Sequence, residues 1–341
     1  MMYQNSTRSS IIRSPNISDS KLNAIKKQLS RLPKFWKERF LVDEWQMILT
    51  DKMPEEIGSF LTQYYFNGGK KEIWINVSIP TLQNNVIYKG IACYVSMEYG
   101  NVSQYKTFSD VCEKESKELK VFMALRGLFS FSQLDLFTEL FSYVIETNGR
   151  NPNFQIDYSY QYIKKWITGE IFDLSRMNIP NYLDIGKFVI KDQIDLVKDA
   201  YENLPQRIRT VFVREGWRIN LSNQKLMNNT TYGICSSAER KVSIRSCSTD
   251  IKLTMYHEFG HYLDYKENFC SNKISFKIIF AQEKQDFHKV CKDEAEYAYA
   301  ISNNEEYFAE LFAYYIKNSN ELKCAVPSSY EFMHRLVSKW S

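Results

Sequence analysis

The sequence has no long apolar run, no marked excess of charge of one sign and no close pair of cysteines. A transmembrane helix needs about 20 consecutive apolar residues, and the most apolar stretch, residues 121–145, is interrupted by Arg126, Asp135 and Glu139. The net charge of +4 over 341 residues gives no reason to expect a nucleic-acid partner. We therefore expect a globular chain with no membrane span and no nucleic-acid partner.

The cysteines argue against two further classes of protein, those stabilised by disulfides and enzymes with a cysteine nucleophile. There are seven of them, an odd number, and they are scattered without any CxxC pair. Scattered thiols in a large chain are usually small buried apolar groups, so we expect reduced cysteines rather than a disulfide framework. No motif supplies the histidine that a cysteine nucleophile requires.

The N-terminal segment lacks the apolar core of a secretory signal of the usual kind. Residues 1–18 are polar and rich in serine and asparagine, which predicts a flexible arm. A cytoplasmic location, export by another route and loss of a leader are all compatible with this segment.

Two halves of the sequence repeat each other. The segment that begins at Leu32, "LPKFWKERFLVDEWQM", aligns without a gap with "LPQRIRTVFVREGWRI", which begins at Leu204. Six of nine positions are identical between "FTELFSYVI" from Phe137 and "FAELFAYYI" from Phe308. The distance along the chain between these two segments is nearly the same as that between the first pair. The alternative is two unrelated helical segments that share common helix formers. We favour an α+β fold with two tandem copies of one mixed α/β unit, residues 19–166 and 191–341, joined by a linker over 167–190.

The second copy has a readable order of elements. A helix over residues 191–204 is expected to precede a strand within 210–221, and a loop then leads to an alternating strand over 240–246. A histidine-containing helix follows, then a lysine-rich amphipathic segment and a helix over 304–318 with aromatic residues at helical spacing.

The stretch "HEFGH" carries the chemistry. Residues four apart lie on one face of a helix, so His257 and His261 can bind one metal ion. Glu258 lies beside them and can take a proton from an attacking water, as in zinc peptidases with this motif. The uncharged neighbours suit a buried helix, and Gly260 is expected to serve close packing. The alternative is a helix with two solvent-facing histidines.

A catalytic zinc ion needs a third protein ligand. The candidates are His288, His334 and the carboxylates of the downstream helix, where Glu306 and Glu310 share a face. Glu306 is suited to bind the metal and Glu310 to accept a hydrogen bond from the outer nitrogen of a ligand histidine. Asp264 competes with Glu310 for that second role. Solvated surface is the alternative for both glutamates.

The pair "HEFGHYLDY" and "YAISNNEEYFAELF" resembles the catalytic domain of the anthrax lethal factor family and the related clostridial Pro-Pro endopeptidases. The resemblance covers about residues 204–341. It implies a zincin-like fold with one Zn²⁺ bound by His257, His261 and Glu306. It also implies that Glu258 is the general base and that Tyr299 supports the oxyanion and the leaving group. A protein substrate would pair in extended form with an edge strand, which we place at residues 240–246.

In that family an N-terminal domain resembles a metal-free copy of the catalytic domain and docks the toxin on its translocation pore. All four histidines of this chain lie in its second half, and Asp135 and Leu128 stand opposite Glu306 and Tyr299. The resemblance therefore implies a first copy that binds no zinc and recognises a receptor, a translocation component or the substrate. The chain differs from lethal factor in lacking its large middle domain.

Three functions are consistent with the sequence. The first is a zinc metalloendopeptidase, either a secreted lethal-factor-like toxin or effector or a peptidase that trims bacterial surface proteins. The second is a binding or delivery module with a vestigial or structural zinc site. The retained Glu258 and Tyr299 argue against it, because a structural site has no use for a base or an oxyanion donor. The third is a cytoplasmic regulatory protease.

Overall fold

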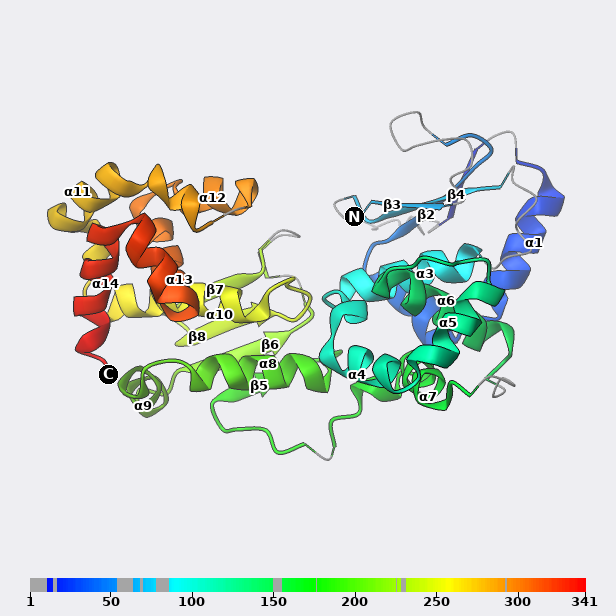
Figure 1. The fold of residues 1–341 in the computed structure, drawn as a ribbon, viewed down its shortest axis with the longest axis horizontal. Helices are drawn as coiled ribbons and strands as arrows, with labels where there is room; N and C mark the ends of the chain where they lie inside the picture. The colour runs from blue at the N-terminus through cyan, green and yellow to red at the C-terminus, as the bar shows by residue number, and fades with distance from the viewer. Residues whose placement is uncertain are drawn as a thin grey trace, which may run out of the picture. The chain divides into compact units, whose positions relative to one another are not determined.

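The computed structural model of the chain divides into two compact units, Met1–Asp173 and Leu174–Ser341 (Figure 1). The structure describes residues 11–14, 17–53, 64–67, 70–77, 86–149, 155–175, 177–224, 226–227, 231–291 and 293–341. Helices predominate in both units, and each unit contains one small sheet. The mixed α+β class predicted from the sequence is confirmed.

The first unit combines short strands with a larger set of helices. Its strands are β1 (Ile11–Arg13), β2 (Gln46–Thr50), β3 (Tyr64–Asn67) and β4 (Glu72–Asn76). Its α-helices are α1 (Asp19–Ser30), α2 (Lys34–Val42), α3 (Val86–Glu98), α4 (Lys106–Lys114), α5 (Ser116–Leu125), α6 (Gln133–Glu146) and α7 (Asp157–Thr168). The 3₁₀ turns η3 (Val102–Gln104) and η4 (Glu170–Phe172) complete the described elements.

The second unit likewise combines short strands with a larger set of helices. Its strands are β5 (Leu183–Ile185), β6 (Arg218–Ser222), β7 (Gly233–Ser236) and β8 (Lys241–Arg245). Its α-helices are α8 (Lys191–Glu202), α9 (Gln206–Arg214), α10 (Ile251–Lys266), α11 (Ile274–Glu283), α12 (Glu294–Ala300), α13 (Asn304–Ala325) and α14 (Pro327–Ser338). The 3₁₀ turns are η5 (Cys270–Asn272) and η6 (Asp286–Lys289).

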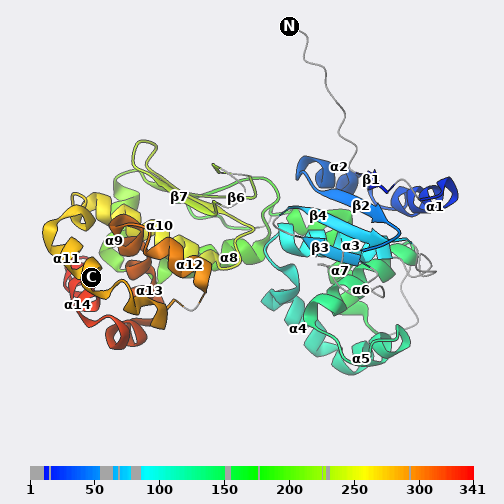
Figure 2. The ribbon, with the colours of Figure 1, turned by 90° about the horizontal axis from the view of Figure 1, so that it is seen from above.

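The two sheets have the same topology. The first has the strand order β1-β2-β4-β3 (Figure 2), and the second has the order β5-β6-β8-β7. In each sheet the first two pairings are parallel and the last is antiparallel. Met47 of β2 pairs with Ile11, and Ile219 of β6 pairs with Leu183, so the registers also correspond.

The position of the edge strand corrects the sequence-based assignment. The strand predicted at residues 240–246 exists as β8, but β8 lies between β6 and β7 in the sheet. Among the described strands, β7 occupies the edge instead. The four residues of β7, "GICS", are too few to show an alternating pattern in the sequence.

The structure also corrects the strand expected within residues 210–221. The first part of this stretch, "TVFV", belongs to α9, and the strand β6 begins only at Arg218. The pattern of burial favours a helix over a strand here, since Ile208, Val211 and Phe212 are buried at helical spacings of three and four residues. The predicted helix over 304–318 is confirmed in α13, which is interrupted by non-helical backbone at Asn318.

Two short strands fall in segments that we expected to be irregular. The strand β1 lies within the arm predicted at residues 1–18, of which residues 1–10 are outside the described part of the chain. The strand β5 lies within the linker predicted at 167–190. Each contributes three residues that pair with a longer parallel strand, a length at which no period can be read from the sequence.

A buried glutamate caps the last helix in each unit. The carboxylate of Glu115 accepts hydrogen bonds from the backbone N–H groups of Tyr158 (2.7 Å) and Ser159 (2.8 Å) at the start of α7. The carboxylate of Glu283 accepts them from Ser328 (2.9 Å) and Ser329 (2.7 Å) at the start of α14. These bonds satisfy amide groups that have no partner within the helix and place a negative charge at its positive end.

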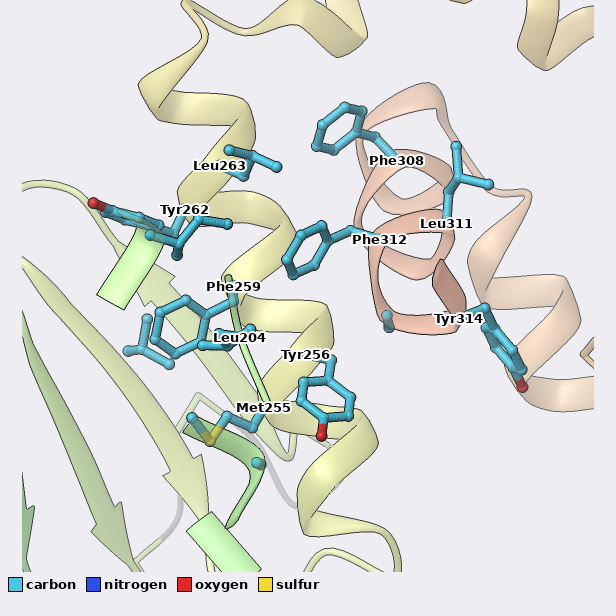
Figure 3. Close-up of a cluster of buried hydrophobic side chains, with 14 of the residues drawn as sticks. Leu204, Met255, Tyr256, Phe259, Tyr262, Leu263, Phe308, Leu311, Phe312 and Tyr314 are labelled. Atoms are coloured by element: carbon cyan, nitrogen blue, oxygen red, sulfur yellow. The ribbon is translucent and has the colours of Figure 1, made fainter. Parts of the chain in front are cut away.

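The core of the second unit lies on both sides of α10. Phe259 packs against Phe212 of α9, with ring centroids 4.8 Å apart. Figure 3 shows Phe308 and Phe312 of α13 directed toward α10 from the other side. The helix with the "HEFGH" stretch is therefore held between the sheet layer and α13. None of the described helices combines the length and the apolar character needed to cross a bilayer.

Candidate metal centre

The site depends on the close contact of α10 with α13. Gly260 faces the backbone of Ala309, and a Cβ atom at position 260 would lie 2.6 Å from Cα and 2.8 Å from the carbonyl oxygen of Ala309. Any side chain at position 260 would push the helices apart. The packing role predicted for Gly260 is confirmed, and the contact brings Glu306 and Glu310 to the histidine face of α10.

Three side chains converge between these helices. Oε2 of Glu306 lies 3.1 Å from Nε2 of His257 and 3.3 Å from Nε2 of His261. The two Nε2 atoms are 3.1 Å apart. These residues are the group in the described part of the chain with donor atoms close enough to share a metal ion.

The second nitrogen of His257 is also engaged. Nδ1 of His257 lies 3.0 Å from Oε1 of Glu310, one turn beyond Glu306 on α13. Both side chains are buried. A carboxylate on the outer nitrogen fixes the ring and leaves Nε2 free to bind a metal, an arrangement common in zinc sites.

Burial and charge act in opposite directions here. Burial lowers the pKa of the His257 imidazole, but the carboxylates of Glu306 and Glu310 outweigh it and raise that pKa well above its usual value. Burial raises the pKa of Glu306, yet the two histidines hold it well below its usual range. The two carboxylates thus favour a positively charged group between the helices.

These residues fit a zinc ion. Ligands about 2.0–2.1 Å from a tetrahedral ion lie roughly 3.3 Å from one another, close to the separations found here. Oε2 of Glu306 is buried and has no hydrogen-bond partner, although two imidazole nitrogens are nearby. Such an oxygen needs a partner, and a cation among the three donor atoms would supply one.

Glu258 is buried directly beneath the edge strand. A Cβ atom at Gly233 of β7 would lie 2.7 Å from Cγ of Glu258, so the strand approaches this carboxyl group as only glycine permits. Burial raises the pKa of Glu258, and the charges of His257 and His261 partly offset that rise. A carboxylate with a raised pKa is a stronger proton acceptor. No sequence pattern indicates that Gly233 meets Glu258, because the two are far apart along the chain.

Tyr299 of α12 lies beside the site. Its ring centroid is 5.8 Å from that of His257, and 51% of the residue is exposed. Burial of its hydroxyl and the neighbouring Glu306 carboxylate raise the pKa of Tyr299. The hydroxyl therefore keeps its proton at neutral pH and can donate a hydrogen bond.

The other candidates have different partners. His288 is exposed, with Nδ1 2.6 Å from the carbonyl oxygen of Gln285, and Nδ1 of His334 lies 2.9 Å from the hydroxyl of Tyr315. Asp264, the competitor of Glu310, instead accepts hydrogen bonds from the backbone N–H (2.8 Å) and hydroxyl (2.6 Å) of Ser271. Asp264 thus orders the turn after α10.

Comparison with known proteins supports a resemblance of the C-terminal part of the chain to the lethal factor family. Residues 218–336 match the family described as "Anthrax toxin lethal factor, N- and C-terminal domain". Among solved structures, that of a Pro-Pro endopeptidase from Paenibacillus alvei is 22% identical in sequence, and the match covers 45% of this chain and 95% of that one with a TM-score of 0.36. No curated protein matches the chain.

Proposed function

We propose that the chain is a zinc-dependent metalloendopeptidase that hydrolyses peptide bonds in a protein substrate. In this proposal one Zn²⁺ per chain is held by His257, His261 and Glu306, and Glu258 and Tyr299 act on the substrate. The observation that carries the proposal is the mutual spacing of the three donor atoms, 3.1 to 3.3 Å, one of which is a buried carboxylate oxygen with no hydrogen-bond partner.

The chain's own residues have distinct roles in the reaction. Bound zinc supplies Lewis acidity, which polarises the substrate carbonyl and activates water. Glu258 takes the proton of the attacking water and passes it to the leaving amine, which its burial and raised pKa favour. Tyr299 donates a hydrogen bond to the carbonyl oxygen as that oxygen gains negative charge. Glu310 holds the ring of His257 in place.

The edge strand β7 is the proposed substrate platform. It pairs with β8 on one side, and no described strand pairs with its other side. An extended peptide can add to such an edge through main-chain hydrogen bonds. Because Gly233 of β7 lies against Glu258, a peptide bound there would have its backbone close to the proposed base.

We propose further that the two units are copies of one zincin-like unit. The two units share their sheet topology and a glutamate that caps their last α-helix. Each unit also has one tyrosine whose ring makes the same two aromatic contacts. The contacts are those of Tyr94 with Phe40 and Trp45, and those of Tyr262 with Phe212 and Trp217. Tyr94 in α3 therefore corresponds to Tyr262 in α10.

This correspondence explains why the first unit is expected to bind no zinc. Lys89 precedes Tyr94 by as many residues as His257 precedes Tyr262. Lys89 forms an ion pair with the buried Glu139, much as His257 contacts Glu310. An ammonium group thus stands where a ligand histidine would be. We propose that the first unit is a binding module for a receptor, a translocation component or the substrate.

The family resemblance favours a secreted toxin or effector, with a cytoplasmic protease as the alternative. The first experiment is the metal content of the purified chain, together with cleavage of an unbiased peptide library with and without a chelator. We expect about one zinc per chain and cleavage that the chelator abolishes. Zinc without cleavage of the library or of intact proteins would favour the binding module with a structural site. Absence of zinc would contradict the proposal.

A further inference from the structure

The first unit contains an apolar pocket that is separate from the proposed metal centre. Its volume is about 330 Å³, within the range of small-molecule sites. Strands β1 and β2 and helices α1, α2 and α3 all contribute to its wall. Leu29, Phe40, Met47 and Ile91 are among the apolar side chains that line it.

The second unit shows why this space is open. The ring of Tyr201 in α8 lies between Tyr182, Phe212 and Phe259, with centroid separations of 3.9, 6.2 and 6.2 Å. Tyr201 stands three residues before Leu204, and Leu29 stands three residues before the aligned Leu32. Leucine therefore occupies in α1 the position that a large aromatic ring occupies in α8.

A second replacement enlarges the same space. Ile91 precedes Tyr94 by as many residues as Phe259 precedes Tyr262, so an aliphatic side chain also replaces one of the aromatic neighbours of Tyr201. The larger Trp36 stands where the second unit has Ile208, yet a pocket of this size is still present beside the smaller side chains of Leu29 and Ile91. Because protein interiors are close-packed, this space can hold a ligand.

The charged residues of the pocket have one sign. Lys26 of α1 and Lys37 of α2 are its charged lining residues, and both are exposed. Neither forms an ion pair with a described residue. Among the described residues that line the pocket there is no carboxylate, so the two lysines favour an anionic group while the apolar side chains favour a hydrocarbon.

We propose that this pocket binds a free fatty acid, with the aliphatic chain against Leu29, Phe40 and Ile91 and the carboxylate between Lys26 and Lys37. A hydrocarbon tail buried in an apolar pocket and a head group held by a few polar contacts are typical of small-molecule sites. This site is independent of the proposed peptidase activity, because its residues lie in the other unit.

Titration calorimetry of the full chain with dodecanoate tests the proposal. We expect one molecule per chain, with hexanoate binding far more weakly, since each buried methylene changes the affinity roughly fourfold. Dodecyltrimethylammonium, which has the opposite charge on the same tail, should bind more weakly than dodecanoate. Absence of dodecanoate binding, or equal binding of the cationic amphiphile, would overturn the proposal.

The variant Leu29→Tyr locates the site. It introduces the residue found at the aligned position of α8 and should weaken dodecanoate binding at least about tenfold, because the ring fills the inner pocket. The control Leu125→Tyr makes the same change at a leucine that is 67% exposed in α5, and it should leave binding unchanged. Full affinity in Leu29→Tyr would refute the assignment.

Two further variants separate folding from binding. If Leu29→Tyr lowers the melting temperature, Ile91→Phe fills the pocket from α3 instead, and it should also weaken binding. The double variant Lys26→Ala, Lys37→Ala should weaken dodecanoate binding by about fivefold while sparing the cationic amphiphile. Equal loss for both amphiphiles would contradict the role of the lysines. Cleavage of the peptide library should be unaffected in all of these variants.

Discussion

Gly260 of α10 faces the backbone of Ala309 of α13 so closely that a Cβ atom at position 260 would lie 2.6 Å from Cα of Ala309. The neighbour is backbone, which cannot rotate away as a side chain can. The distance between α10 and α13, and with it the reach of Glu306 to the histidines, therefore depends on the absence of one methyl group.

The substitution Gly260→Ala should consequently weaken zinc binding. We expect a loss of about 1–3 kcal/mol in the free energy of unfolding from overpacking and a lower metal affinity because Glu306 moves away from the histidines. Thermal unfolding and competition with a zinc-binding dye measure the two effects. Gly90→Ala in α3 is the control, since a Cβ atom there meets only the side chain of Ile73. It should leave zinc affinity unchanged, and an equal loss of affinity in both variants would contradict the explanation.

Removal of the two carboxylates of α13 should have unequal effects. Glu306→Ala removes a proposed ligand and should abolish stoichiometric zinc binding at micromolar metal. Glu310→Ala removes only the group that orients His257, which typically costs 10–100-fold in affinity. Metal analysis after dialysis against a weak chelator distinguishes the two. Full zinc content in Glu306→Ala would move the third ligand to another residue.

Glu258→Gln should retain zinc and lose hydrolysis. The amide has the same shape but accepts no proton, and general-base catalysis contributes about 10²–10⁴-fold to a rate. Cleavage of the best library peptide, normalised to bound zinc, gives the measure. Glu305→Gln on α13 is the matched control, because its carboxylate is bonded to Asn272 on the surface. An active Glu258→Gln variant would refute the proposed base.

Gly233→Ala tests the approach of the edge strand to Glu258. The added methyl group has to displace either the carboxyl group or the strand. We expect an unchanged zinc content and at least a tenfold lower cleavage rate, since the base would no longer face the bound peptide. Cys235→Ala, two residues further along β7, adds no bulk and should stay active. Cleavage by Gly233→Ala at the wild-type rate would show that the strand accommodates the added methyl group, which would contradict the proposed dependence on Gly233.

Lys89→Met should destabilise the first unit without affecting zinc. Glu139 is 2% exposed, and its remaining partner is Arg126, whose Nε lies 3.0 Å from Oε2 of Glu139. Removal of one partner of a buried pair typically costs about 3–5 kcal/mol. Lys34→Met is the control, because the pair of Lys34 with Glu38 is solvent-exposed and should contribute about 0–1 kcal/mol. Chemical denaturation and metal analysis of both variants provide the test.

The parts of the site that could be predicted from sequence are those set by local spacing. The spacing of His257 and His261 on a helix, and that of Glu306 and Glu310 on another, follow from helical geometry alone. The resemblance of this region to the lethal factor family is confirmed for residues 218–336. The assignment of individual catalytic roles stays a prediction that the variants above test.

The parts that could not be predicted depend on pairing and packing at a distance. Alternation predicts a strand at residues 240–246, and the family resemblance implies that it is the edge strand. The edge strand β7 is only four residues long and takes its place from its register with β8. The run "TVFV" has high strand propensity, but burial of Phe212 and its helical neighbours placed it in α9. The partner of Asp264, likewise, depends on the turn after α10, whose geometry no motif encodes.

The glutamates that cap α7 and α14 bear on the order in which the chain folds as it is synthesised. Glu115 is satisfied once residues through Ser159 have left the ribosome, so the first unit can close while the metal-binding helices are still being made. Glu283 lies between those two helices in the sequence and finds its partners only at Ser328 and Ser329. The proposed peptidase unit thus reaches its final structure after all its metal ligands have emerged, which delays an active protease until the rest of the chain is already folded.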